Sequence, residues 1–296
     1  MQRLVLLCIF LLALLGCEKK VEFDLNEAVE LLTVDASIEN DQDPVVILTR
    51  SLNYFSKISA EVLGNTIIKD AEVFVSDGTK THQLRRYDVV VPGTTIPFSF
   101  YSSDPANPST IIKGELGKSY QLRIVWEGKE FTSSTTIPQL RKVVDSLWWV
   151  KAPNTPDTST RAVVRARVVD PAGFGDYARY FTKVNGGIFL PGFSSVFDDA
   201  FVNGVTYTVD VDRGVDRNVE LDFDDYGFFR KGDTVTLKFS NINKATFDFW
   251  RTVEYSYQSI GNPFSTPTKI LGNISNGALG YFGGYANQFT TVTIPR

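Results

Sequence analysis

The chain has 296 residues and a formal net charge of −4, and it contains no run of lysines or arginines, so its composition does not favour binding to nucleic acid. Two cysteines and one histidine are too few for zinc chemistry or cysteine catalysis, and we expect no cofactor. Aromatic residues make up 13% of the chain, and together with the many Val, Thr and Gly residues they favour β-structure.

A hydrophobic segment runs from Leu4 to Leu15, directly after Met-Gln-Arg. It is too short to cross a bilayer, which needs roughly 20 residues, and its length suits a secretory signal. The segment ends in Leu-Leu-Gly16-Cys17, which resembles the bacterial lipobox. The lipobox implies cleavage between the small residue Gly16 and Cys17, and a diacylglycerol on the Cys17 thiol. We therefore predict a lipoprotein signal peptide over 1–16, the alternative being an ordinary signal that ends in Gly-Cys by chance.

The segment 17–30 is polar and acidic, and it is predicted to be a lipidated tether. Cys8 lies in the part that would be removed, so Cys17 would keep no partner for a disulfide. An N-terminus that carries more than one acyl chain anchors stably to a membrane. No Asp directly follows Cys17, so the inner-membrane retention signal known from enterobacteria is missing. The charged residues 18–20 are similar to segments that mark surface export. We expect a lipid anchor in the outer membrane, on the cell surface rather than on the periplasmic face.

Residues 31–138 are predicted to form an N-terminal β-sandwich of immunoglobulin-like or transthyretin-like type. Ala71, Val73 and Val75 face one way and the residues between them the other, and Asp77-Gly78 then supplies a tight turn. The stretch SYQLRIVW alternates in the same way from Tyr120 to Trp126. Such short strands without a helical period between them are typical of sandwiches.

Residues 139–296 are predicted to form a second β-sandwich domain with one helix at about 243–260. The stretches RAVVRARVV, VTYTVDV and DTVTLKF indicate strands. The helical series is Phe247, Trp250, Val253 or Glu254, and Tyr257, at three- to four-residue steps. Asn243 can cap the N-terminus, and Gly261 begins a stop signal. The expected fold is therefore mainly β, with two β-sandwich domains and one amphipathic helix in the C-terminal one.

The order of these features resembles a family of Bacteroidota lipoproteins, domain-of-unknown-function family 4249. The resemblance is carried by the lipobox and by VDASIENDQDPVVILTRSLNYF, DDAFVNG, SYQS, GNPFS and NISNGALGYFGGY. The last motif is the most specific, and its residues, which we interpret as structural, are Asn273, Asn276, Gly277, Phe282, Gly283 and Gly284. The resemblance implies an outer-membrane lipoprotein that is often associated with TonB-dependent transporters. It implies no established activity.

Phenylalanine recurs every fourth residue in GIFLPGFSSVFDDAFVNG, next to two acidic residues. These aromatic and acidic residues are Phe189, Phe193, Phe197, Asp198, Asp199 and Phe201. Pro191, Gly192 and Gly204 favour a long loop over a helix, and ordered loops on β-scaffolds often bind partners. We therefore predict a partner- or ligand-binding loop over 189–204. The alternative is that the rings pack the loop onto the core.

Catalytic residues are harder to find. His82, the only histidine, follows a predicted turn, and we expect it on the surface rather than in a Ser-His-Asp triad. The acidic residues from Asp210 to Asp225 could hold a structural Ca²⁺ ion, but alternation places Asp210 and Asp212 on the solvent face of a strand. We expect no enzyme, and a hydrolase that uses paired carboxylates is the weakest alternative.

These features together predict a non-enzymatic accessory or binding subunit of an outer-membrane β-barrel, such as a TonB-dependent transporter. The main alternative is an independent glycan- or peptide-binding lipoprotein that uses exposed aromatic rings. For that role Trp148 and Trp149 are further possibilities, although we expect one of them to be buried in the seam between the two halves.

Overall fold

The structure is a computed structural model that describes residues 30–52, 59–90, 97–156, 158–262, 265–266 and 268–296. The predicted signal peptide and all of the predicted tether except Glu30 lie outside these residues. Residues 31–296 form one compact unit, which is mainly β, as predicted. No helix of the described residues is long and apolar enough to cross a membrane.

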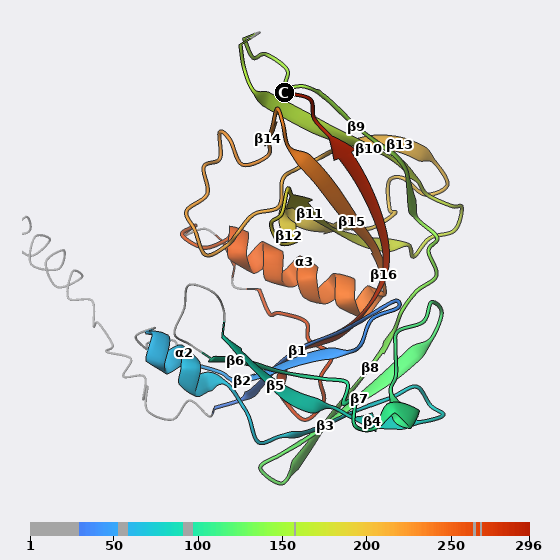
Figure 1. Cartoon of the computed structure of the whole chain (residues 1–296), viewed down its shortest axis with the longest axis vertical. Coiled ribbons are helices and arrows are strands. Elements are labelled where there is room, and N and C mark those ends of the chain that lie inside the picture. Colours follow the sequence, from blue (N-terminus) through green and yellow to red (C-terminus); the bar gives the residue numbers. More distant parts are fainter. Residues whose placement is uncertain (1–29, 53–58, 91–96, 157, 263–264, 267) are drawn as a thin grey trace, which may run out of the picture. The chain divides into compact units, whose positions relative to one another are not determined.

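The largest element is an eight-stranded sheet in the order β12-β11-β15-β16-β1-β2-β6-β5 (Figure 1). Its strands in chain order are β1 (Leu32–Glu39), β2 (Val45–Arg50), β5 (Arg85–Val90), β6 (Pro97–Ser102), β11 (Tyr177–Val184), β12 (Leu190–Phe197), β15 (Thr234–Ile242) and β16 (Leu279–Thr293). The two halves of the chain meet where β1 pairs in parallel with β16, from Thr33 opposite Leu279 to Glu39 opposite Tyr285. One sheet therefore spans both halves.

The N-terminal half of the chain forms a sandwich on this sheet. A second sheet, in the order β4-β3-β7-β8, comprises β3 (Glu72–Ser76), β4 (Thr81–Gln83), β7 (Ser119–Trp126) and β8 (Lys129–Thr136). Val73 and Ile124 from this sheet share one core with Val34, Ile38 and Leu48 from the large sheet. The alternation predicted for β3 and β7 is confirmed. A short helix, α2 (Ala60–Thr66), begins at the Ser59 cap and is not predicted by the alternation, and a 3₁₀ turn covers Pro108–Thr110.

The C-terminal half of the chain packs a third sheet on the other part of the large one. Its strands are β9 (Val143–Lys151), β10 (Arg161–Val169), β13 (Thr206–Val211) and β14 (Phe229–Arg230). β9 pairs with one side of β10, and β13 pairs along the other. The Gln288 side chain on β16 exchanges hydrogen bonds with the backbone of Val144 on β9, at 2.9 and 2.7 Å. These contacts close the sandwich on its β9–β16 side, whereas β12 and β13 are both edge strands.

The predicted helix is present as α3 (Lys244–Gln258), with Asn243 as its cap. The Asn243 side chain accepts a hydrogen bond from Thr246 N–H at 2.9 Å, which satisfies one of the unpaired donors at the helix start. α3 packs against β16, β12 and β11 (Figure 1). Phe249 stacks on Tyr281 with 4.3 Å between ring centroids, and the Trp250 indole N–H donates to the Tyr285 hydroxyl at 2.9 Å.

Two hydrophobic cores lie on either side of the predicted boundary at residue 138. The first takes most of its buried residues from 32–137, and the second takes most of its own from 144–239. β16 contributes to both, with Phe282 and Ala286 in the first core and Val292 against the second. The division into 31–138 and 139–296 stays a prediction, to which the structure adds a strand that joins both cores.

Candidate binding pocket

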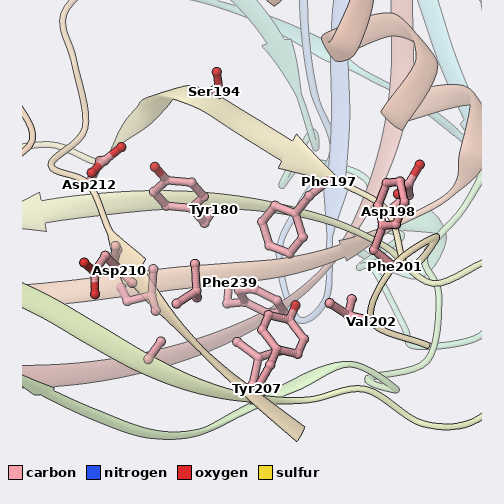
Figure 2. A pocket seen from close by; sticks show the side chains of 15 residues that line it. Tyr180, Ser194, Phe197, Asp198, Phe201, Val202, Tyr207, Asp210, Asp212 and Phe239 are labelled. Carbon is pink, nitrogen blue, oxygen red and sulfur yellow. The ribbon is translucent and has the colours of Figure 1, made fainter. Parts of the chain in front are cut away.

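A pocket of about 400 Å³ opens on the side of the C-terminal sandwich where the two sheets are not closed (Figure 2). Its floor and walls come from β10, β11, β12, β13 and β15. The lining residues are Ala166, Val168, Tyr180, Ser194, Phe197, Asp198, Phe201, Val202, Tyr207, Val209, Asp210, Val211, Asp212, Leu237 and Phe239. Most of these side chains are apolar, and the volume is in the range of small-molecule or side-chain binding sites.

The apolar lining follows from strand alternation on facing sheets. Val168 and Val211 point inward from one sheet, while Leu237 and Phe239 point inward from the other. Phe197 stands between them and packs against Phe239, with 5.7 Å between ring centroids. Elsewhere in the sandwich such residues meet across the core. Here the sheet edges leave a gap, so part of the core surface is open to solvent.

Two loops at one end of the pocket hold each other in place. The Gly175 N–H donates to Asp199 Oδ2 at 2.8 Å, and the Gly204 N–H donates to Asp170 Oδ2 at 3.1 Å. These bonds join the loop after β10 to the loop after β12. The second loop presents Phe201 with 99% of its surface exposed. Phe201 lines the pocket, so its exposed ring extends the apolar surface of the pocket outward, and contiguous apolar patches of this kind mark interaction sites.

A buried ion pair supports this end of the pocket from below. The Nζ atom of Lys142 lies 2.9 Å from Asp170 Oδ1, and both side chains are fully buried. Lys142 Nζ also lies 5.7 Å from the centroid of the Phe197 ring. Because Asp170 also holds Gly204, the pair connects the core to the loop that carries Phe201.

Polar groups occupy the walls and the two ends of the pocket. Tyrosine hydroxyls are protonated at neutral pH and can donate hydrogen bonds. Burial raises the pKa of Tyr207 to about 12, and burial also raises the pKa of Tyr180. Asp210 and Asp212 lie at one end, and Asp198 lies beside Phe201 at the other (Figure 2). Burial, with a smaller effect of the neighbouring Asp210, raises the pKa of Asp212.

The structure brings three of the predicted binding residues to this pocket, namely Phe197, Asp198 and Phe201. The prediction of a loop over 189–204 is wrong for its first part, because Leu190–Phe197 forms the edge strand β12. The β11–β12 pairing shifts register between Arg179 and Phe181, which lets the strand accommodate Pro191 and Gly192. Gly192 is required there because a Cβ atom would lie 2.0 Å from the Tyr180 hydroxyl.

The other three predicted binding residues lie elsewhere. Phe189 packs beside Phe289, with 5.8 Å between ring centroids. Phe193 packs among other aromatic rings on the outer side of β12, including Tyr257 of α3. Asp199 is buried and accepts hydrogen bonds from the backbone N–H groups of Gly175 and Asp176 in the loop after β10, so it acts as a structural acceptor.

His82 is buried, so the expectation of a surface position is wrong. Its Nε2 accepts a hydrogen bond from the Asp104 N–H at 2.8 Å, and its Nδ1 lies 2.8 Å from the Thr110 hydroxyl. Val75 and the other alternating residues of β3 face the same core, and the short strand β4 turns His82 inward beside them. Both ring nitrogens therefore contact neighbouring residues of the fold.

Acidic side chains do not gather into a metal site anywhere in the described ranges, where no three His, Cys, Asp or Glu residues lie close enough to hold an ion. Asp210 pairs with Arg165 at 2.8 Å. Asp225 pairs with Arg161 at 2.9 Å and also contacts Arg230. The predicted solvent-facing position holds for Asp210, whereas Asp212 is half-buried and lines the pocket.

Residues 18–291 match a protein family described as "Domain of unknown function (DUF4249)". This chain belongs to the DUF4249 family. No curated protein and no solved structure matches it. The DUF4249 match covers nearly the whole described body, so the pocket lies within the family domain.

The C-terminal motif that first indicated DUF4249 fixes the start of β16. The Asn273 side chain exchanges two hydrogen bonds with the backbone of Phe282, at 2.9 and 2.8 Å. Asn276 and Gly277 both have positive φ, of 57° and 76°, and form the turn before the strand. The ring of Phe282 is fully buried in the first core.

Gly283 and Gly284 of the DUF4249 motif permit close packing. A Cβ atom on Gly284 would lie 2.5 Å from the Thr136 carbonyl oxygen, and one on Gly283 would lie 2.7 Å from the Tyr281 ring. These motif residues lie outside the pocket lining. The predicted lipidation and cleavage residues Cys17 and Gly16 lie outside the described part of the chain.

Several pocket residues were not singled out by their sequence context. Tyr180 and Tyr207 stand in ordinary alternating strands, and nothing in that pattern separates a residue that lines an opening from one in a closed core. What distinguishes these residues is that β12 and β13 lie at sheet edges. That position follows from long-range strand pairing, which the sequence pattern does not show.

Proposed function

We propose that this DUF4249 protein is a non-enzymatic, lipid-anchored binding protein of the outer membrane, and that it serves a β-barrel partner such as a TonB-dependent transporter. The single observation that carries the binding role is the apolar pocket between β12 and β13, with the exposed Phe201 at one end. The membrane anchor rests on the lipobox at Gly16-Cys17.

The chemistry of the pocket supports binding rather than catalysis. Its polar groups are tyrosine hydroxyls that stay protonated, one serine and three carboxylates. The only histidine of the chain is buried elsewhere, with both ring nitrogens in local contacts. A serine in this pocket therefore has no imidazole beside it that could take its proton.

Co-purification from the native outer membrane in mild detergent tests the proposal. The tagged wild-type protein is expected to retain a stoichiometric β-barrel partner. Phe201→Ser is expected to lose that partner if Phe201 is an anchor of the contact, because truncating an interface hot spot costs about 2 kcal/mol or more. Phe223→Ser is the matched control, since Phe223 is also exposed, at 69%, and does not line the pocket. A partner retained equally by both variants, or a wild-type protein without a partner, would contradict the proposal.

A second candidate function is glycan binding, and one surface favours it. Phe193, Phe223, Tyr226 and Tyr257 form a cluster of rings with centroids 5.8–6.3 Å apart. Phe223 exposes most of its surface, and aromatic faces are suited to stacking on sugar rings. A glycan array that shows binding lost in Phe223→Ser and kept in Phe201→Ser would favour this role over partner binding.

A further inference from the structure

The pocket between β12 and β13 carries acidic side chains beside its apolar lining. Asp198, Asp210 and Asp212 border it, and no lysine or arginine is among its lining residues. Asp210 is neutralised by Arg165 at 2.8 Å. Neither Asp198 nor Asp212 has an ion-pair partner within the described residues. The pocket therefore carries two uncompensated carboxylates, one toward each end (Figure 2).

Nearby basic residues do not cancel these charges. Lys142 lies beneath Phe197, but its charge is held by Asp170 at 2.9 Å. Arg213 follows Asp212 in the chain and lines a neighbouring hollow rather than this pocket. An apolar site bordered by unpaired carboxylates is complementary to an apolar group that carries positive charge beside it.

The strands beside the pocket indicate the form of the occupant. β13 is the last strand of its sheet, and an extended peptide can add to such an edge by backbone hydrogen bonds. The edge of β12 is already used in part, since the Arg217 guanidinium donates to the carbonyl oxygens of Gly192 and Phe193, at 3.4 and 3.5 Å. β13 is therefore the edge available to a partner strand.

We propose that this pocket binds an extended segment of a partner protein, with aromatic or aliphatic side chains in the pocket and basic residues on either side of them. The segment lies along β13, its apolar side chains contact Phe197 and Tyr207, and its basic side chains face Asp198 and Asp212. This inference rests on the proposed function and adds the chemistry of the partner segment to it.

Three labelled peptides test the inference by fluorescence anisotropy with the full-length protein. They share the central sequence Phe-Val-Phe and are flanked on both sides by Lys, by Ser or by Glu. In low salt the Lys peptide is expected to bind about tenfold more tightly than the Ser peptide, and the Glu peptide more weakly than both, since two partly exposed charge pairs each contribute a few-fold. This preference is expected to shrink at high salt.

Charge variants identify the residues responsible. The double variant Asp198→Asn/Asp212→Asn is expected to bind the Lys and Ser peptides with nearly equal affinity. Asp224→Asn is the matched control, because Asp224 is exposed and lies outside the pocket lining, and it is expected to keep the full preference. An equal loss of preference in Asp224→Asn would assign the effect to overall charge and overturn the inference.

The possible failures are distinguishable. Equal affinity for all three peptides, lost in Phe201→Ser, would overturn the preference for basic residues and leave the pocket as a binding site. If no peptide bound while the Phe201-dependent partner still co-purified, a linear segment would be the wrong occupant. If no peptide bound and no such partner co-purified, the proposed function itself would be contradicted.

Discussion

Replacing Lys142 with methionine tests the part of the structure that connects the core to the pocket. Lys142 and Asp170 are both fully buried, and their charged atoms lie 2.9 Å apart. Asp170 Oδ1 makes no aligned hydrogen bond, so the Lys142 charge is its main compensation. In Lys142→Met the carboxylate keeps the Gly204 N–H but stays buried without a counter-charge, which typically costs about 3–5 kcal/mol of folding free energy. For a body of this size the melting temperature is expected to fall on the order of 10 °C.

The double variant Lys142→Met/Asp170→Asn separates charge from packing. Asparagine removes the unpaired charge, and its side-chain oxygen can still accept the Gly204 N–H. We therefore expect the double variant to recover about half of the lost stability. Lys244→Met is the surface control, since Lys244 is 67% exposed in its pair with Asp248, and its effect on stability is expected to be far smaller than that of Lys142→Met.

Urea unfolding at pH 7, followed by tryptophan fluorescence, measures these differences. A loss of less than about 1 kcal/mol in Lys142→Met would refute the argument from buried charge. So would a double variant that is no more stable than the single one. Weaker peptide binding by a folded Lys142→Met would further support the connection between this pair and the Phe201 loop.

Three further predictions concern backbone space and protonation. Gly280→Ala is expected to destabilise the fold by more than about 3 kcal/mol, because a Cβ atom would lie 1.8 Å from the Val34 carbonyl oxygen. Gly277 also has positive φ but faces open space, so Gly277→Ala is expected to cost about 1 kcal/mol. Urea titrations of both variants measure the difference. Burial raises the pKa of Asp212, so its ionised form opposes folding. Asp212→Asn is therefore expected to raise the melting temperature at pH 7, by an amount that shrinks as the pH falls below that raised pKa and is lost below the ordinary value of 3.8. Burial lowers the pKa of His82, so the folded protein holds the imidazole neutral. NMR titration of this single imidazole, after removal of any tag, is expected to show a midpoint below about 6.5. The free energy of unfolding is expected to fall as the pH drops below about 6.5. A midpoint at or above 6.5 would contradict its burial.

Strand alternation was the most informative signal in the sequence. It predicted β3 and β7 with their inward faces, and the Asn243 cap with the spacing of Phe247 and Trp250 predicted α3. These features are local, so neighbouring residues are enough to reveal them. His82 shows the limit of such reasoning, because its burial depends on Asp104 and Thr110, which lie more than twenty residues away along the chain.

The candidate site was predicted only in part, for a similar reason. Phe197, Asp198 and Phe201 stood out because aromatic and acidic residues recur there. The pocket itself exists because β12 and β13 are sheet edges that face each other without closing, and this depends on the pairing of β1 with β16 and of β9 with β10. Long-range pairing of this kind leaves no local pattern, so Tyr180, Tyr207 and Asp212 could not be assigned to a site from sequence.

Site-specific photo-crosslinking in the native outer membrane tests the central claim most directly. A photoreactive amino acid replaces Phe201 beside the pocket, and in a second strain it replaces Phe289, which is 56% exposed on β16 and lies outside the pocket lining. The account predicts that the crosslinker at position 201 captures one β-barrel protein through a segment rich in basic and aromatic residues, and that position 289 does not capture it. Capture of the same proteins from both positions, or of no β-barrel from position 201, would contradict the account.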